Sequence, residues 1–331
     1  MTIAVLGAGA FGSAIAVTLA KNRSQVYLWT RTKKHADDLE QQLENKKYLK
    51  SVRFPETLIP TNDLSLACRS SKAILLCIPT QNIYKFFSKN HSLLPKIPIV
   101  LCSKGIHEAT SLLQSDIVKK FLPRNKIGVL TGPSFASEIA RGLPTALTLA
   151  CENQTLRQKL QNLIATPTLR IYSSNDIIGA QLGGSLKNVI AIACGMAKGA
   201  KLGESARIAL MTRGFAEIVR LGTAMGSDPN TFYGLSGLGD LALTCNSTLS
   251  RNFCLGLNYS KNSINVPSLT IEGIKTASAA HKLAKILNIE VPIIKSVDLI
   301  LKNKLTVKTA MVDLLSRPLK SEYLYTQISK D

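Results

Sequence analysis

Several features are scarce in this sequence of 331 residues, and each scarcity excludes a class of protein. No apolar run approaches the roughly 18 residues that a membrane-spanning helix needs. Residues 1–6 read as the start of a strand, without the basic segment and cleavage site of a secretory signal. Low-complexity segments, internal repeats and Gly/Pro-rich tracts are missing. We therefore expect a globular chain in the cytoplasm, with no stable insertion into a membrane.

Cysteine and histidine are too sparse to indicate a disulfide framework or a metal centre. The seven cysteines are an odd number and include no C-x-x-C pair. Cys77 and Cys102, among others, stand in apolar runs, which is typical of buried reduced thiols in a cytosolic protein. The four histidines lack the spacing of metal ligands, so we expect no metal.

Acidic residues are also few: 21 of them face 41 basic residues, for a net charge of +20. Nucleic-acid binders usually concentrate their cations on one helix or arm, whereas here they are spread along the chain. We therefore expect no nucleic-acid partner. Approach to an anionic membrane surface, attraction of anionic substrates and a generally basic proteome remain as explanations.

The first half of the chain alternates between strand and helix patterns. Helical spacing appears at 12–21 and 33–46, between short apolar runs rich in β-branched residues. This alternation predicts an α/β domain of the Rossmann type, with a doubly wound, mostly parallel sheet. The runs that we expect to form strands are 2–6, 25–29, 73–78, 98–103, 126–131, 146–150 and 169–172.

The pattern changes near residue 175, because long segments with helical spacing then replace the strands. Such segments cover 177–197, 206–226, 274–287 and 292–302. We therefore expect two domains, residues 1–175 and an all-helical domain at 176–331, with the ligand site in the cleft between them.

A glycine-rich turn after the first strand predicts a dinucleotide site. Gly7, Gly9 and Gly12 form G-x-G-x-x-G between a predicted strand and a predicted helix, which is the context that this motif requires. Gly7 permits the tight turn, Gly9 lets the backbone approach a pyrophosphate, and Gly12 lets the helix pack closely on the strand. The start of the helix then offers N–H donors to the anion.

The residues after the second strand bear on the choice of cofactor. Sites specific for NAD usually carry an acid there for the ribose 2′-hydroxyl, but this chain has Arg31, followed by Lys33 and Lys34. Our hypothesis is that Arg31 pairs with a 2′-phosphate, so that NADPH is used at least as well as NADH. The alternative is a solvated basic turn.

Two further strands end in residues suited to a small polar ligand. Lys104 follows one strand and precedes a glycine, so that its ammonium could reach a substrate oxygen or phosphate. Gly132 and Ser134 follow the next strand, where they suit close backbone approach and hydrogen bonding. A surface lysine in a loop and an ordinary turn are the alternatives.

Lys187 is the most informative polar residue, because it interrupts a long apolar helix pattern beside Asn188. Gly183 and Gly184 lie on its helix face and should leave space over it. An ammonium in an apolar setting is costly unless it is paired, and desolvation favours its neutral form. We therefore predict an acid or base acting near neutral pH, against the alternative of a lysine that reaches solvent.

Two segments of the second half add possible partners. Asp240 is a lone carboxylate in a glycine-dense apolar turn and could pair with Lys187 or cap a helix. Ser250, Arg251 and Asn252 place a guanidinium between two polar side chains, which suits a phosphate.

Taken together, these segments resemble the bacterial NAD(P)-dependent glycerol-3-phosphate dehydrogenases over nearly the whole chain. The resemblance implies reversible reduction of dihydroxyacetone phosphate to sn-glycerol 3-phosphate for glycerophospholipid biosynthesis, with NADPH or NADH as cosubstrate. It also implies a homodimer. The motifs that carry it are 7–12, 103–105, 131–135, 181–191, 237–241, 250–252 and 272–273.

The resemblance also implies roles for individual residues, with Lys187 as the catalytic acid/base. The substrate site would consist of Lys104, Gly132, Ser134, Lys187, Asp240, Ser250, Arg251 and Asn252. The cofactor would contact Gly7, Gly9, Ala10, Phe11, Gly12, Arg31, Lys104, Ala136, Arg251, Ile271 and Glu272. Ala10 and Phe11 depart from the Ser/Thr and Trp/Tyr frequent in relatives, which removes a possible hydroxyl contact but keeps the backbone donors.

Two other functions remain open on the residues alone. One is a related two-domain dehydrogenase acting on a hydroxy acid or another phosphorylated ketone. The other is a cofactor-binding sensor or scaffold without turnover, against which the lysine set in an apolar helix argues. Poor activity on glyceraldehyde and on unphosphorylated dihydroxyacetone would separate the enzyme alternatives.

Overall fold

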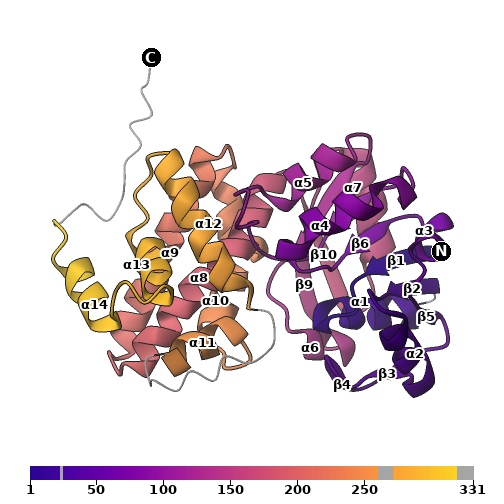
Figure 1. Cartoon of the computed structure of the whole chain (residues 1–331), viewed down its shortest axis with the longest axis horizontal. Helices are drawn as coiled ribbons and strands as arrows, with labels where there is room; N and C mark the ends of the chain where they lie inside the picture. Colours follow the sequence, from indigo (N-terminus) through magenta and orange to yellow (C-terminus); the bar gives the residue numbers. More distant parts are fainter. Residues whose placement is uncertain (23–24, 260–270, 319–331) are drawn as a thin grey trace.

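The computed structural model describes residues 1–22, 25–259 and 271–318. It has an α/β half and a helical half that lie side by side (Figure 1). The α/β half is built on one eight-stranded sheet with the order β10-β9-β8-β7-β6-β1-β2-β5. Its strands are β1 (Thr2–Leu6), β2 (Gln25–Trp29), β5 (Leu58–Thr61), β6 (Ile74–Leu76), β7 (Ile99–Leu101), β8 (Ile127–Thr131), β9 (Thr145–Ala150) and β10 (Leu169–Ser174).

The predicted mostly parallel sheet is confirmed. The pairings from β5 through β2, β1, β6 and β7 to β8 are all parallel, whereas β9 is antiparallel to β8 and parallel to β10. The carboxyl ends of β1, β2, β6, β7 and β8 therefore meet at one edge. All seven predicted strands form, with ends that differ by up to two residues.

Helices cover both faces of the sheet because its strands are apolar on both sides. In β1, Ile3 and Val5 join one buried cluster, and Ala4 and Leu6 join the cluster on the other face. The first cluster is covered by α1 (Ala10–Lys21), α2 (Lys33–Gln42), α6 (Ala136–Ala140) and α7 (Gln154–Ile164). The second is covered by α3 (Leu64–Arg69), α4 (Thr80–Asn90) and α5 (Gln114–Phe121).

The end that we predicted for the helix α2 was wrong. The predicted helix 33–46 ends at Gln42, because Leu43 is left-handed with φ 49° and the next residues form the hairpin of β3 (Glu44–Asn45) and β4 (Leu49–Arg53). The strand β5 was not predicted. It contains Pro60, which is tolerated because β5 lies at the edge of the sheet.

The second half contains only helices among its described residues. They are α8 (Ile177–Gly199), α9 (Glu204–Ala224), α10 (Asp240–Cys245), α11 (Arg251–Tyr259), α12 (Glu272–Ile286), α13 (Pro292–Leu301) and α14 (Val307–Leu315), with short turns at Pro229–Tyr233 and Leu235–Gly239. The helix α8 is at the centre of this half, and α9, α10, α11, α12 and α13 pack around it.

The helix α8 is long and apolar enough to cross a membrane by length and composition alone. However, 94% of its most apolar window is buried inside the protein, so it serves as the core of the helical half. A lysine in the buried stretch of this helix must find partners within the protein, because solvent does not reach it.

Candidate functional site

The glycine turn between β1 and α1 has the geometry of a pyrophosphate cradle. Gly7 has φ +115°, and a Cβ there would come within 2.9 Å of the Cys77 backbone. A Cβ on Gly12 would strike the carbonyl oxygen of Gly7, whereas nothing lies within 4 Å of a Cβ on Gly9. The space above Gly9 is therefore open to a ligand, while Gly7 and Gly12 are fixed by close packing.

The start of α1 adds hydrogen-bond donors to this cradle. Gly9 is its N-cap and gives no side-chain hydrogen bond, and the first turn contains no acidic residue. The N–H groups and the positive end of the helix dipole thus remain available to an anion. The buried Asn45 supports the turn by donating to the Ala8 carbonyl oxygen at 2.9 Å and to Ser13 Oγ at 2.7 Å. A role for Asn45 was not predicted from the sequence, because this residue lies in the segment 33–46, for which a helix was predicted.

The other cofactor residues lie near this turn or along the same edge. Ala10 and Phe11 begin α1 and are half-buried, and Ala136 begins α6. Arg31 is exposed just beyond β2, whose Trp29 carbonyl oxygen accepts from Gly7 N at 3.0 Å. This position is open to a 2′-phosphate and equally to solvent.

Lys187 and Lys104 share one carboxylate. Lys187 Nζ lies 2.5 Å from Asp240 Oδ1, and Lys104 Nζ lies 2.6 Å from Asp240 Oδ2. The Asp240 side chain is completely buried, while those of Lys187 and Lys104 are 8% and 19% exposed. The structure thus brings the end of β7 together with α8 and α10 around one buried negative charge.

Two further bonds fix the lysines. Lys104 also donates to the Gly132 carbonyl oxygen at 3.1 Å, which places the end of β8 in the site. Lys187 donates to Thr244 Oγ1 at 2.5 Å, and Thr244 donates to the Asp240 carbonyl oxygen at 2.7 Å. Thr244 was missed from the sequence, although its spacing of four residues from Asp240 on a helix could have identified it.

Burial dominates the electrostatics of Lys187. Loss of solvent lowers the pKa of its ammonium to about 8; the Asp240 carboxylate raises this pKa and the Lys104 ammonium lowers it. An amine with this pKa can give or take a proton near neutral pH, which is the property that acid/base chemistry requires.

The glycines beside Lys187 allow close packing and do not leave the empty space that we expected. A Cβ on Gly183 would lie 2.5 Å from the Ser236 carbonyl oxygen, and one on Gly184 would lie 2.5 Å from Thr131 Oγ1. The last residue of β8 and the turn before α10 therefore press directly on α8. This contact brings Lys104 and Asp240 within reach of Lys187.

A polar chain connects three helices next to the lysines. Asn252 Nδ2 donates to Asn188 Oδ1 at 3.0 Å, and Gly273 N donates to Asn252 Oδ1 at 3.1 Å. These bonds join α8, α11 and the start of α12. Ser250 Oγ accepts from Phe253 N at 3.2 Å and so helps to begin α11, whereas Arg251 is exposed at the same end.

Glu272 connects the helical half to the sheet. Its Oε1 accepts a hydrogen bond from Thr80 N at 3.1 Å, at the start of α4 after β6. The preceding Ile271 is buried and is the N-cap of α12. The Ser134 hydroxyl donates to the Gly132 carbonyl oxygen at 3.3 Å, and the same oxygen accepts from Lys104.

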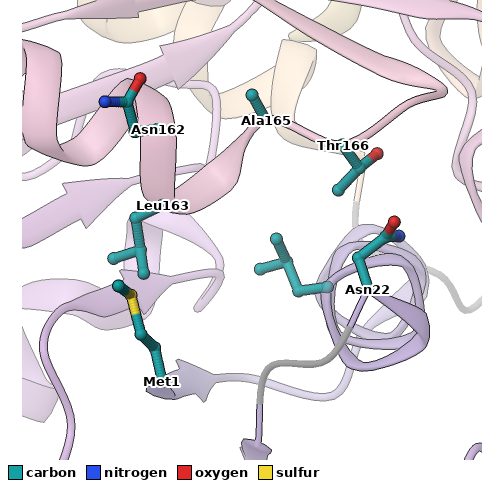
Figure 2. A pocket seen from close by; sticks show the side chains of 7 residues that line it. Met1, Asn22, Asn162, Leu163, Ala165 and Thr166 are labelled. Atoms are coloured by element: carbon teal, nitrogen blue, oxygen red, sulfur yellow. The ribbon is translucent and has the colours of Figure 1, made fainter.

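A separate hollow lies between Met1, the carboxyl end of α1 and the residues at and after the carboxyl end of α7 (Figure 2). Its lining side chains are uncharged. They belong to Met1, Leu19, Asn22, Asn162, Leu163, Ala165 and Thr166. Among the described residues, no three His, Cys, Asp or Glu side chains gather in a way that could hold a metal ion.

Comparison with known proteins agrees with this geometry. Residues 2–157 match the model of the NAD-dependent glycerol-3-phosphate dehydrogenase N-terminus, and residues 176–312 match that of its C-terminus. The chain is 46% identical over 323 residues to glycerol-3-phosphate dehydrogenase [NAD(P)+] of Ruegeria sp. (strain TM1040), covering 97% of this chain and 100% of the relative. It is 42% identical to the protein of that name from Brucella suis biovar 1 (strain 1330), covering 97% and 98%.

A solved structure gives the same result. The crystal structure of glycerol-3-phosphate dehydrogenase from Coxiella burnetii superposes with a TM-score of 0.91 at 36% identity, covering 96% of this chain and 99% of that one. Both halves of the chain are thus matched, in sequence and in fold. The chain belongs to the NAD-dependent glycerol-3-phosphate dehydrogenase family.

Proposed function

We propose that this protein reduces dihydroxyacetone phosphate to sn-glycerol 3-phosphate with NAD(P)H, reversibly, and that Lys187 is its general acid and base. The observation that carries the proposal is the buried Lys187 beside Asp240, 2.5 Å away, at the carboxyl edge of a sheet that carries a pyrophosphate cradle. Bound NAD(P)H supplies the hydride.

The residues of the chain have separable tasks in this reaction. Protonated Lys187 gives its proton to the oxygen of the ketone as that oxygen gains negative charge, and the neutral amine takes the proton back in the reverse reaction. Lys104 adds a second positive charge near that oxygen or the phosphate. Asp240 holds both ammonium groups in place, at 2.5 and 2.6 Å, so that neither must be oriented during the reaction.

The remaining predicted residues complete the proposed binding sites. Exposed Arg251 clamps the substrate phosphate with Ser250 and Asn252, while Gly132 and Ser134 line the substrate site from the end of β8. The cofactor occupies the cradle at Gly7, Gly9 and Gly12, with Ala10, Phe11, Arg31, Lys104, Ala136, Arg251, Ile271 and Glu272 along its path. We place the division between the two domains at residue 175, between β10 and α8.

The test is an assay of reduced nicotinamide oxidation with purified protein. We expect rapid oxidation with dihydroxyacetone phosphate, and little with unphosphorylated dihydroxyacetone or glyceraldehyde, because they lack the group that Arg251 binds. Equal rates with the phosphorylated and unphosphorylated ketones would contradict the assignment of a phosphate site. Preference for a hydroxy acid would favour another two-domain dehydrogenase.

We further propose a homodimer that works in the cytoplasm and supplies glycerol 3-phosphate for phospholipids. The first half of α9, before Gly214, buries no residue although it contains Ile208, Leu210 and Met211. A second copy of the chain would cover this apolar surface. Light scattering should give twice the chain mass of 35.8 kDa, and Ile208→Lys should reduce it.

All seven cysteines are free thiols, which suits the reducing cytoplasm.

A further inference from the structure

Only one of the two carboxylate oxygens of Glu272, a largely buried residue, has a hydrogen-bond partner among the described residues. Its Oε1 accepts the hydrogen bond from Thr80 N at 3.1 Å, across 192 residues of sequence. Its Oε2 is buried and has no hydrogen-bond partner within the described ranges 1–22, 25–259 and 271–318. Buried polar oxygens are rarely left without a partner, so an unpaired carboxylate oxygen indicates that a ligand completes the site.

The order of strands indicates which part of the dinucleotide lies there. The neighbouring strands β2, β1, β6 and β7 are followed by Arg31, Gly7, Thr80 and Lys104 in turn. A dinucleotide with its pyrophosphate at the β1 turn and its adenosine beside β2 extends its nicotinamide half past β6 and β7. Glu272 binds the backbone just after β6 and therefore belongs to the nicotinamide end.

A second contact places the free oxygen beside the backbone that follows Lys104. A Cβ built on Gly105 would lie 3.1 Å from Glu272 Oε2 and 3.0 Å from Thr80 Oγ1. Gly105 directly follows Lys104, and its N–H donates to Ser185 Oγ on α8 at 2.8 Å. The absence of a side chain at position 105 therefore leaves the carboxylate beside the backbone that carries Lys104.

Burial and the neighbouring groups act in opposite directions on the pKa of the Glu272 carboxyl. Burial raises the pKa of its carboxyl to about 7, although the Thr80 N–H and the Arg251 guanidinium act to lower it. Lys104 and Lys187 are neutralised in part by Asp240. Three residues further along α12, Lys275 pairs with Glu108 at 2.7 Å, and burial lowers the pKa of His107, the residue before Glu108.

We infer that Glu272 sets the relative affinity for oxidised and reduced cofactor through its charge, the ionised carboxylate favouring the cationic oxidised nicotinamide ring and the neutral carboxyl favouring the uncharged reduced ring. The inference rests on the proposed function, since it assumes a nicotinamide at this edge. The proton of the carboxyl is the only bond that changes at Glu272. Reduced cofactor is thereby held best at low pH, and oxidised cofactor is held best at high pH.

The size of the effect follows from charge separation within a partly desolvated cleft. Unit charges several ångströms apart at an effective dielectric constant of about 20 change an affinity by roughly tenfold or more. We therefore expect the ratio of the NAD⁺ and NADH dissociation constants to fall about tenfold as pH rises through neutrality. NADP(H) is less suitable as a probe, because its 2′-phosphate titrates in the same range.

The experiment measures dissociation constants of NADH by fluorescence and of NAD⁺ by competition, at several pH values from about 6 to about 8.5. Wild type should show the full pH dependence of the ratio. Glu272→Gln should show a weaker one, left by Lys187 with its pKa of about 8, and Glu272→Asp a partial recovery. Glu108→Gln, which removes a carboxylate paired with Lys275, should behave as wild type. Persistent NADH binding by Glu272→Gln shows that the variant is folded.

Two results would overturn the inference. One is an equal pH dependence of the ratio in wild type and Glu272→Gln, and the other is a ratio that does not change with pH in wild type. Either could occur while dihydroxyacetone phosphate is still reduced normally. Failure of the proposed function would instead appear as missing turnover, so the two are distinguishable.

Discussion

Lys187 Nζ and Asp240 Oδ1 lie 2.5 Å apart in a buried site, although 53 residues of sequence separate them. The same carboxylate also binds Lys104, so one negative charge faces two positive ones. This arrangement keeps the Lys187 ammonium in a dry environment without leaving it unpaired. It also makes the proton affinity of that amine depend on both neighbours.

Removal of the amine should abolish most turnover. For Lys187→Ala we expect kcat to fall by about 10²–10⁴-fold, because the proton donor is lost, while NADH binding measured by fluorescence persists. Lys198→Ala is a matched control on the same helix, since Lys198 is exposed and pairs with exposed Glu204. Near-normal turnover of Lys187→Ala would remove Lys187 from its proposed role.

The pH dependence of ketone reduction should report the Lys187 amine. Because the pKa of Lys187 is about 8 and reduction needs the protonated form, kcat for reduction should fall as pH rises through about 8. Oxidation of glycerol 3-phosphate should rise over the same range. Stopped-flow single turnovers at a series of pH values would measure both directions.

Substitutions of Asp240 and of Lys104 should shift the pH at which the reduction rate falls, in opposite directions. Asp240→Asn removes the charge that raises the Lys187 pKa, so the fall in reduction rate should begin at lower pH. Lys104→Gln removes a charge that lowers the same pKa, so the fall should begin at higher pH. A shift of both variants in one direction would contradict the electrostatic model.

Arg31 offers a test of cofactor selection. If Arg31 pairs with the 2′-phosphate, Arg31→Ala should lower the ratio of kcat/KM for NADPH over NADH by about 10–100-fold, the value of a charge-assisted contact of about 1.5–3 kcal/mol. Lys34→Ala, an exposed change in the first turn of α2, is the control. An unchanged ratio in Arg31→Ala would mean that the arginine only faces solvent.

Glu217 should make the stability of the helical half depend on pH. Its buried carboxylate accepts from Ile293 N at 2.7 Å and Ile294 N at 3.0 Å, at the start of α13. Burial nevertheless raises its pKa to about 7. The folded state then binds this proton more tightly than the unfolded state, whose carboxyl titrates near the ordinary value of about 4.3.

The free energy of unfolding should therefore fall as pH rises. Between about pH 5 and pH 8, wild type should lose about 1–3 kcal/mol of unfolding free energy relative to Glu217→Gln, which cannot ionise. Urea denaturation of both proteins at the two pH values measures this difference. Glu290→Gln, an exposed change in the same region, should follow wild type. Parallel curves for wild type and Glu217→Gln would show that the carboxyl does not titrate differently on folding.

The sequence by itself determined the features that depend on neighbours in the chain. The alternation of apolar runs predicted the sheet, and Gly7, Gly9 and Gly12 predicted the cradle, because turns and helix starts follow from local spacing. Likewise, Lys187 stood out because an ammonium within an apolar helix has an evident energetic cost. The short hairpin at Asn45 escaped the same reasoning, since its buried amide bonds to residues more than 30 positions earlier.

Only the tertiary structure decided how the energetic cost of burying the Lys187 ammonium is offset. The shared carboxylate of Asp240, the Thr244 hydroxyl and the Glu272 bond to Thr80 all join residues that are distant in the sequence. Close packing at Gly183 and Gly184 brings the end of β8 and the turn before Asp240 against α8. The hydrophobic period of the sequence carries no information about which elements will pack there. Hydrophobic patterning specifies which faces are buried, whereas the pairing of buried charges follows from how the faces fit together.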